Sequence, residues 1–198
     1  MTLNGSKIYG PKGSGVLFKK KEVELAPIIH GGEQEFGLRP GTENVAGIVG
    51  FAKALEITEK IKIKESVRLT KLRDYFISKL LKLNHSNILK NVRISVNGDL
   101  KNRLPNNVNI SVSGFESELL VLELDAKGIA VSSKSACKTE SEEFYVIKAL
   151  RQSSGQAINP NFDSKKEGVV RFSLGRNTQK KDIDYVIQSI KLIIQKYI

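Results

Sequence analysis

The chain has 198 residues, the size of one domain or of one domain and part of another. Hydrophobic residues make up 40% and charged residues 27%, a composition typical of a globular protein rather than a disordered or fibrous one. The single cysteine excludes an intramolecular disulfide framework and is consistent with a reducing compartment. No apolar stretch is long enough for a signal peptide or a membrane span, so we expect a cytoplasmic protein.

The net charge of +11 raises the question of nucleic acid or acidic protein partners. The lysines are scattered along helical patterns, however, and no basic block is interleaved with aromatic residues. A solvated, lysine-rich surface is therefore the favoured interpretation, and direct nucleic-acid binding is not expected. His30 and His85 lie far apart in the sequence, and with one cysteine they make no recognisable metal site.

The first part of the chain is punctuated by glycine and then becomes helical. Residues 16–18 indicate a short buried strand, and residues 26–42 form a loop rich in glycine, proline and charge, long enough to suggest a function. Thr42 is placed as the N-cap of a helix, and a second amphipathic stretch follows the first. The apolar positions of the two stretches are Val45, Ile48, Phe51, Ala52 and Leu55, and then Ile63, Val67, Leu72, Phe76 and Leu80.

The remainder mixes strands and helices, which predicts an α/β or α+β fold. The expected strands are 92–96, 108–112, 129–131 and 170–174. The expected helices are 116–125, ended by Gly128, then 142–151, and 182 to the end, with a polar loop over 152–168. In the last strand, alternation turns Arg171 away from the apolar side. The predicted core comprises Val108, Ile110, Leu119, Leu122, Phe172, Leu174, Ile183, Val186 and Ile190.

Three local features have side chains suited to chemistry. Lys7 precedes a rigid Gly-Pro turn, so it can be held in place for Schiff-base formation with an aldehyde cofactor. The segment 30–42 ends at a helix N-terminus, where Thr42 and free backbone N–H groups suit a phosphate. Arg171 can grip a carboxylate bidentately from its strand. Taken singly, each has a plainer interpretation: a surface lysine, an ordinary N-cap and a solvent-facing arginine.

The only cysteine, Cys137, lies in a stretch rich in serine, lysine and glutamate. A free cysteine is usually a small buried hydrophobic residue, but these neighbours favour an exposed thiol. Lys134 and Lys138 flank it and favour the thiolate, which is the nucleophilic form. The alternative is a solvent-facing cysteine with no role.

Six segments, in this order, resemble the C-terminal half of cysteine desulfurases of the NifS/IscS type. These are pyridoxal 5'-phosphate (PLP) enzymes with the aminotransferase class V fold, a type I PLP-dependent transferase fold. Each segment alone is a modest signal, and six together are a strong one. The segments are residues 7–13, 30–35, 39–47, 103–111, 131–137 and 171–176.

The resemblance implies a role for each candidate residue. Lys7 matches the lysine that binds PLP covalently, and Cys137 matches the nucleophile that takes the sulfur of L-cysteine and becomes a persulfide. Arg171 matches the arginine that holds the substrate carboxylate. Thr42 matches a residue that reaches the PLP phosphate of the partner subunit in a dimer. The cysteine loop resembles the long mobile version of the first desulfurase group, which would let Cys137 carry sulfur to an acceptor protein.

The chain also departs from the family pattern. Ser6 stands where a histidine that helps to hold the cofactor phosphate is common, Asn4 replaces a common serine, and Lys134 replaces a common glycine. A full desulfurase has about as much chain again before the PLP lysine. We therefore expect either a separate N-terminal chain or a partial product, with poor PLP binding by this chain alone.

These observations lead to one main interpretation. Residues 1–60 are expected to end the large PLP domain, and residues 61–198 to form the small C-terminal domain. With its complement, the chain would convert L-cysteine to L-alanine and pass sulfur to an Fe–S scaffold or a tRNA thiolase. The alternatives are a non-catalytic persulfide carrier or scaffold, a selenocysteine lyase, and a protein that binds RNA or an acidic partner.

Overall fold

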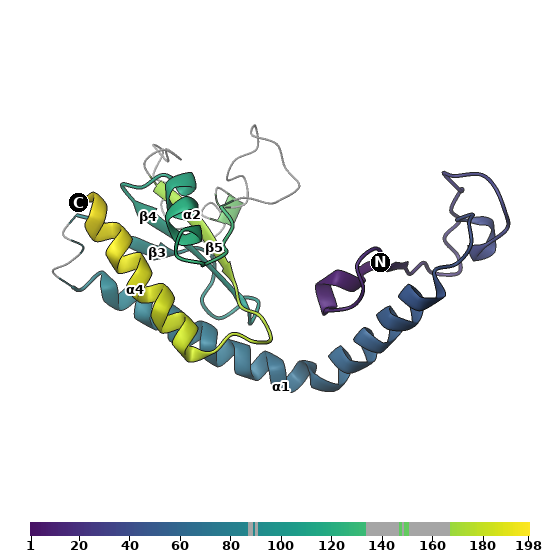
Figure 1. Ribbon diagram of the computed structural model, residues 1–198, viewed down its shortest axis with the longest axis horizontal. Coiled ribbons are helices and arrows are strands. Elements are labelled where there is room, and N and C mark those ends of the chain that lie inside the picture. The colour runs from purple at the N-terminus through teal and green to yellow at the C-terminus, as the bar shows by residue number, and fades with distance from the viewer. Residues whose placement is uncertain (87–88, 90, 134–146, 148, 151–166) are drawn as a thin grey trace. The chain divides into compact units, whose positions relative to one another are not determined.

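The computed structural model describes residues 1–86, 89, 91–133, 147, 149–150 and 167–198 (Figure 1). The chain divides into two compact units, Met1–Ile63 and Lys64–Ile198. The division falls inside one helix, α1, which runs from Val45 to Leu83. The boundary expected after residue 60 falls in the same helix.

The first unit begins with a two-stranded antiparallel sheet. Strand β1 (Thr2–Asn4) pairs with β2 (Gly15–Leu17), and the short 3₁₀ helix η1 (Gly5–Ile8) lies between them in sequence. A second 3₁₀ turn, η2 (Glu35–Gly37), lies in the expected long loop. The strand expected at residues 16–18 is present, but its burial was wrongly predicted, because Val16, Leu17 and Phe18 are all exposed.

Helix α1 replaces the two helical stretches expected between residues 42 and 80. Between Gly50 and the end of this helix at Leu83 there is no glycine or proline to interrupt the backbone hydrogen bonding. Its N-cap is Asn44, whose side-chain Oδ1 accepts a hydrogen bond from Gly47 N at 3.0 Å. Thr42 lies two residues earlier and is not the cap, which corrects the sequence prediction.

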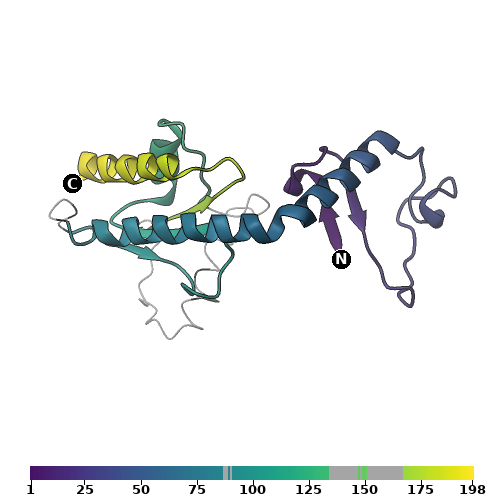
Figure 2. The ribbon, with the colours of Figure 1, turned by 90° about the horizontal axis from the view of Figure 1, so that it is seen from below.

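The second unit is built on a three-stranded antiparallel sheet in the order β3-β4-β5. The strands are Ile94–Val96, Asn107–Ser113 and Glu167–Ser173. Helix α2 (Ser117–Asp125), helix α4 (Lys180–Tyr197) and the C-terminal part of α1 pack on one face of this sheet, and α4 runs beside α1 (Figures 1 and 2). Phe76 of α1 meets Phe172 of β5 edge to face, with ring centroids 5.1 Å apart.

Most of the predicted core is confirmed. Leu119 and Val186 are partly buried against the core, but Leu122 was wrongly predicted and is 68% exposed. It lies two positions from both Leu120 and Leu124, and at 100° per residue that places it on the opposite face of α2. The predicted residues that are buried are Val108, Ile110, Phe172, Leu174, Ile183 and Ile190, and Phe76 and Leu80 of α1 join them. In the same helix, Ile63 and Val67 are exposed.

Other boundaries differ from the sequence prediction. The strand expected at 129–131 is only an isolated bridge between Ser132 and Arg171. Helix α4 begins at Lys180, two residues before the predicted start at residue 182, because Gln179 and Asp182 form a reciprocal capping box. The helix and loop expected over 142–168 lie mostly outside the described residues.

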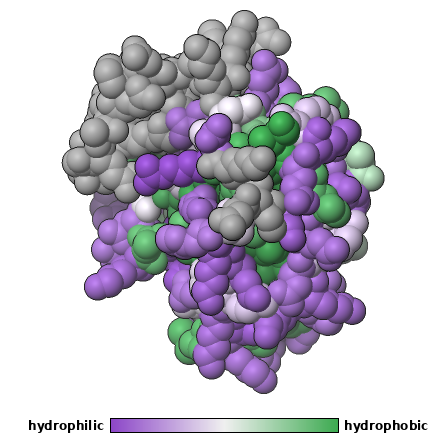
Figure 3. All heavy atoms as spheres, turned by 90° about the vertical axis from the view of Figure 1, so that its left-hand side faces the viewer, coloured by the Kyte–Doolittle hydropathy of each residue, from purple (hydrophilic) through white to green (hydrophobic). Residues whose placement is uncertain are grey.

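Polar and charged side chains cover most of the described surface on the face seen in Figure 3, where apolar side chains show between them. Lys71, Lys180 and Lys181 are among the exposed lysines of the second unit. Among the described residues, no helix is both long and apolar enough to cross a membrane.

Candidate functional site

Lys7 lies on a turn whose backbone is fixed by several contacts. Asn4 caps the 3₁₀ helix η1, and its Oδ1 accepts bonds from Ser6 N at 3.0 Å and Ser6 Oγ at 2.9 Å. At the other end, Tyr9 adopts a left-handed conformation, with φ 62° and its N–H bonded to Gly5 O. Gly10 N bonds the same carbonyl oxygen at 2.8 Å. These hydrogen bonds therefore fix the backbone that carries Lys7.

Gly5 explains how this turn packs. A Cβ atom there would lie 2.8 Å from Ser14 Oγ and 2.9 Å from both Phe51 Cδ2 and Pro11 O. Such distances are closer than real Cβ contacts, so only glycine fits between the turn and helix α1. Lys7 itself is exposed. The result is an accessible primary amine on a hydrogen-bonded turn, and a primary amine is the group that forms a Schiff base with an aldehyde.

Thr42 lies in the segment between η2 and α1 and is exposed. The loop before it is held by Gln34, whose Oε1 accepts a bond from Gly41 N at 3.2 Å. In the same loop Phe36 has a φ of 60° and is 98% exposed. Ser6, Lys7 and Thr42 thus all belong to the first unit, whereas Arg171 belongs to the second.

Arg171 lies in the middle of β5 between the buried residues Val170 and Phe172, and is itself half-buried. Its N–H donates to Ser132 O at 2.7 Å, and its carbonyl accepts from Ser132 N at 3.2 Å. On the neighbouring strand β4, the residue opposite Arg171 is Asn109. The prediction that Arg171 faces away from the apolar core is confirmed, because alternate residues of β5 form that core.

Cys137 and Lys134 lie outside the described residues. The chain is described up to residue 133, and Ser132 is five residues before Cys137.

A row of polar side chains beside Arg171 was missed in the sequence. Asn97 is 7% exposed, and its Nδ2 donates to Asn109 Oδ1 at 2.7 Å and to Ser111 Oγ at 2.9 Å. Ser111 Oγ in turn donates to Asn97 Oδ1 at 3.2 Å. These residues alternate with the core positions of β4, so they lie on the opposite face of the sheet, with Arg171. The polar alternation in 107–111 was the available signal.

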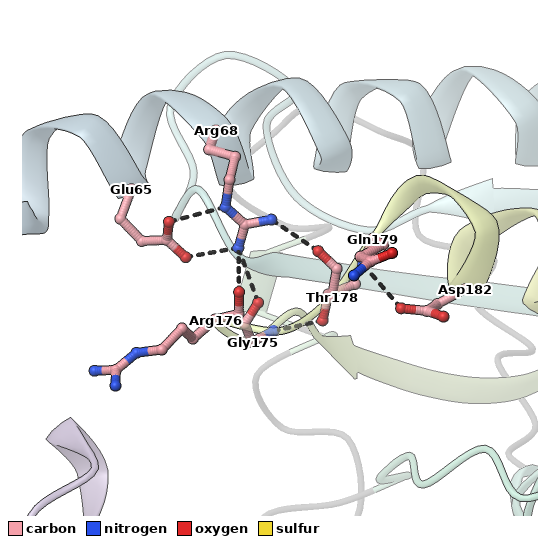
Figure 4. A network of polar contacts seen from close by, with 7 residues as sticks. All are labelled: Glu65, Arg68, Gly175, Arg176, Thr178, Gln179 and Asp182. Carbon is pink, nitrogen blue, oxygen red and sulfur yellow. Dashed lines mark hydrogen bonds and ion pairs between the residues drawn. The ribbon is translucent and has the colours of Figure 1, made fainter.

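Arg68 of α1 was also missed, because a charged residue on a surface helix gives no sign of its contacts. Its guanidinium forms a bidentate ion pair with Glu65, at 2.6 and 2.8 Å (Figure 4). It also donates to three carbonyl oxygens of the turn between β5 and α4, those of Gly175, Arg176 and Thr178, at 2.7 to 3.1 Å. The hydrogen bonds from Arg68 lower the pKa of the Glu65 carboxyl.

Two further arginines support the segment that precedes β4. Arg73, which is 5% exposed, pairs with Asp74 at 2.8 Å and donates to the carbonyl oxygens of Arg103 and Leu104. Burial, followed by the charge of Arg73, lowers the pKa of the Arg103 guanidinium. These contacts fix the chain on its way into the strand that carries Asn109.

One other possible site contains none of the predicted site residues. A cavity of about 410 Å³ in the second unit has Phe76, Phe172, Leu174 and Ile183 among its lining residues, and it lies on the core side of the sheet, away from the face of Arg171. Within the described part of the chain, no three His, Cys, Asp or Glu side chains are grouped so that they could hold a metal ion.

Comparison with known proteins places these features in context. Residues 1–186 match the aminotransferase class-V family. The chain is 41% identical over 200 residues to the cysteine desulfurase IscS of Dictyoglomus turgidum, covering 99% of this chain and 46% of that protein. It is 39% identical over 197 residues to the cysteine desulfurase IscS 1 of Archaeoglobus fulgidus, covering 99% and 47%.

Solved structures agree with this result. A NifS-like protein matches with a TM-score of 0.79 and 30% identity, over 98% of this chain and 46% of that one. A NifS-like protein from Rickettsia africae matches with a TM-score of 0.72 and 26% identity, over 97% and 46%. The chain therefore spans about half the length of the relatives it matches. The resemblance and the fold class expected from the sequence are both confirmed.

Proposed function

Because the chain belongs to the aminotransferase class-V family, we propose that it forms the C-terminal half of a PLP-dependent cysteine desulfurase. In this proposal residues 1–60 end the large domain and residues 61–198 form the small one. The observation that carries the proposal is the pair of backbone hydrogen bonds between Ser132 and Arg171. It ties the start of the cysteine segment to the strand that presents an arginine for the substrate carboxylate.

The residues of the Lys7 turn fit a role in holding PLP. The Lys7 amine is exposed on a rigid support, and Thr42 is exposed in the same unit. Ser6 fits less well, since both its N–H and its hydroxyl already donate to Asn4, so a phosphate contact would have to replace one of these bonds. When bound, PLP supplies an electron sink that labilises bonds of an attached amino acid.

Cys137 is the proposed sulfur acceptor. Its thiolate would attack the sulfur of L-cysteine, forming an S–S bond as the substrate C–S bond breaks. The electron pair of that C–S bond stays with the carbon skeleton, which is then protonated to L-alanine. Lys134 and Lys138 favour the thiolate that this attack needs. The persulfide sulfur would then pass to an acceptor protein of Fe–S cluster assembly or of tRNA thiolation.

Exposed apolar side chains in the first unit support a role for further polypeptide in completing the site. Ile28 is 93% exposed, Phe36 98% and Ile29 57%, and Val45 and Val49 of α1 are exposed as well. Large apolar side chains exposed in this way are typical of a surface that another polypeptide covers. In this proposal the surface is covered by the N-terminal half of the fold or by the second subunit of a homodimer.

A non-catalytic persulfide carrier is the second candidate. It is favoured by the separate hydrophobic core of the second unit. That unit contains Arg171 and the start of the cysteine segment, whereas Lys7 belongs to the first unit. In that case Cys137 would accept sulfur from another enzyme. Whether Lys7 binds PLP separates the two candidates.

The deciding experiment is borohydride reduction of the purified chain with PLP, followed by peptide mass mapping. It is performed with the chain alone and with the polypeptide encoded immediately upstream. A pyridoxyl adduct on Lys7 in either preparation supports the desulfurase, and Lys7→Ala must abolish that adduct. Absence of the adduct in both preparations would overturn it in favour of the carrier.

A further inference from the structure

We propose that Asn109 is a second donor for the substrate carboxylate, acting beside Arg171, and that Asn97 orients it. This inference rests on the proposed function, because it takes Arg171 as the carboxylate-binding residue. It names a specificity-determining side chain for amino-acid substrates. Asn97, Asn109 and Arg171 all belong to the second unit.

The first step is the pairing between the two strands. The N–H and C=O of one residue in a strand point to the same side, and those of Arg171 both bond Ser132. On the other side, Arg171 and Asn109 therefore form a pair without hydrogen bonds between them. The Asn109 carbonyl agrees with this, since it points to β3 and accepts from Asn97 N at 2.9 Å. In such a pair the two side chains are closest, with Cβ atoms about 4.5–5.5 Å apart on one face of the sheet.

The second step is the orientation of the Asn109 amide. Its Oδ1 accepts from Asn97 Nδ2 at 2.7 Å, and Asn97 is itself buried and bonded to Ser111. An unrestrained asparagine would turn its carbonyl oxygen towards the guanidinium and compete with a substrate carboxylate. Here Asn97 engages that oxygen. The amide Nδ2 of Asn109 and the Arg171 guanidinium form no hydrogen bond to any residue that the structure describes.

The third step is the chemistry of the ligand. A carboxylate offers about four lone-pair positions, and a bidentate guanidinium uses two of them. A neighbouring amide N–H₂ supplies a further donor without adding charge. A substrate that lacks the carboxylate would leave both groups without a partner, and such loss discriminates strongly between substrates. The pair would therefore select L-cysteine over its decarboxylated analogue cysteamine.

The test uses three variants in the preparation that forms the Lys7 adduct. Asn109→Asp keeps the acceptor for Asn97 but replaces the donor with a negative charge. Asn107→Asp makes the same change on the same strand and face, opposite Ser173 instead of Arg171. Arg171→Ala tests the proposed function itself. The measurements are KM and kcat for L-cysteine, the inhibition constant of cysteamine, and Tm.

Asn109→Asp is expected to raise KM for L-cysteine about 10- to 100-fold, the range of a hydrogen bond to a charged group. The inhibition constant of cysteamine should stay within about 2-fold, and Tm should hold or rise by about 1–2 °C, because opposite charges then face each other across the strands. Asn107→Asp should change KM for L-cysteine less than about 3-fold, since its charge lies farther away.

Two results would overturn the inference, and they are distinguishable. If Arg171→Ala raises KM for L-cysteine while Asn109→Asp leaves it unchanged or only lowers Tm, Asn109 is structural and the proposed function stands. If Arg171→Ala leaves KM unchanged, or no preparation turns over L-cysteine, the proposed function fails and the inference fails with it.

Discussion

Ser132 and Arg171 exchange both of their backbone hydrogen bonds, at 2.7 and 3.2 Å, although 39 positions separate them in the sequence (171 minus 132). Among the described residues this bridge is isolated, because it is not part of a pair of strands. It joins the segment that leads to Cys137 to the strand that carries the proposed carboxylate-binding arginine. A role for Arg171 in substrate binding and a role in stability can therefore be separated, because the bridge uses only its backbone.

Arg171→Ala should raise KM for L-cysteine at least about 10-fold, because a bidentate charge-assisted contact is lost. The free energy of unfolding should change by less than about 1 kcal/mol, since the Ser132 bridge remains and the side chain is half-buried. Steady-state kinetics and urea unfolding measure the two effects. A matching loss of stability of several kcal/mol would instead identify Arg171 as a structural residue.

Cys137→Ser should abolish formation of the enzyme persulfide and leave the Lys7 adduct unchanged. Serine is nearly isosteric but lacks the nucleophilic thiolate, and the turn that carries Lys7 is formed within the first unit. Mass spectrometry after incubation with L-cysteine detects the persulfide, and borohydride reduction detects the adduct. Loss of both signals in Cys137→Ser would contradict the separation of the two roles.

Arg68→Ala should lower the free energy of unfolding by about 2 kcal/mol, because three carbonyl oxygens of the turn after β5 lose a charged donor. Tyr75→Phe is the matched control. It removes the hydrogen bond from Tyr75 of α1 to Asp184 of α4 but touches no carbonyl of that turn. Because this bond is exposed, its loss should have a smaller effect. Equal urea midpoints for the two variants would show that the carbonyl contacts of Arg68 add no stability.

The sequence predicted most of the second unit because its patterns are long and regular. The alternation in 108–112 and 170–174 places Val108, Ile110 and Phe172 in the core, and the structure confirms this. Leu122 was wrongly assigned because a leucine-rich helix of nine residues has apolar residues on more than one face. Packing of α2 against the sheet, which no local pattern encodes, selects Leu120 and Leu124 instead.

The residues of the candidate site show the same contrast between local sequence patterns and contacts made in the folded chain. Lys7, Thr42 and Arg171 were singled out because their local motifs are distinctive, although Thr42 is not the helix cap that it resembled. Asn109 and Arg68 were missed because their partners lie on other elements: Asn97 across the sheet, and Gly175 on a turn 107 residues away. Long-range hydrogen bonds depend on the folded backbone, so single-sequence patterns do not show them.

The ion pair between Glu65 and Arg68 predicts a pH dependence of stability. The hydrogen bonds from Arg68 lower the pKa of Glu65 from its ordinary value of 4.5. Above about pH 4.5 the carboxylate is ionised in both the folded and the unfolded chain, and the stabilisation is fully present. As the pH falls further, the unfolded chain binds a proton first, so stability is lost until folded Glu65 is protonated as well.

Glu65→Gln should therefore weaken the acid-induced loss of stability below about pH 4.5, as measured by urea unfolding at a series of pH values. Glu59→Gln is the matched control. Glu59 pairs with Lys62 on the same helix at 2.6 Å, but both side chains are more than half exposed, and such pairs contribute little. The pH profile of Glu59→Gln should therefore follow that of the wild type. Parallel pH profiles for wild type and Glu65→Gln would show that the Glu65–Arg68 pair has no part in acid stability.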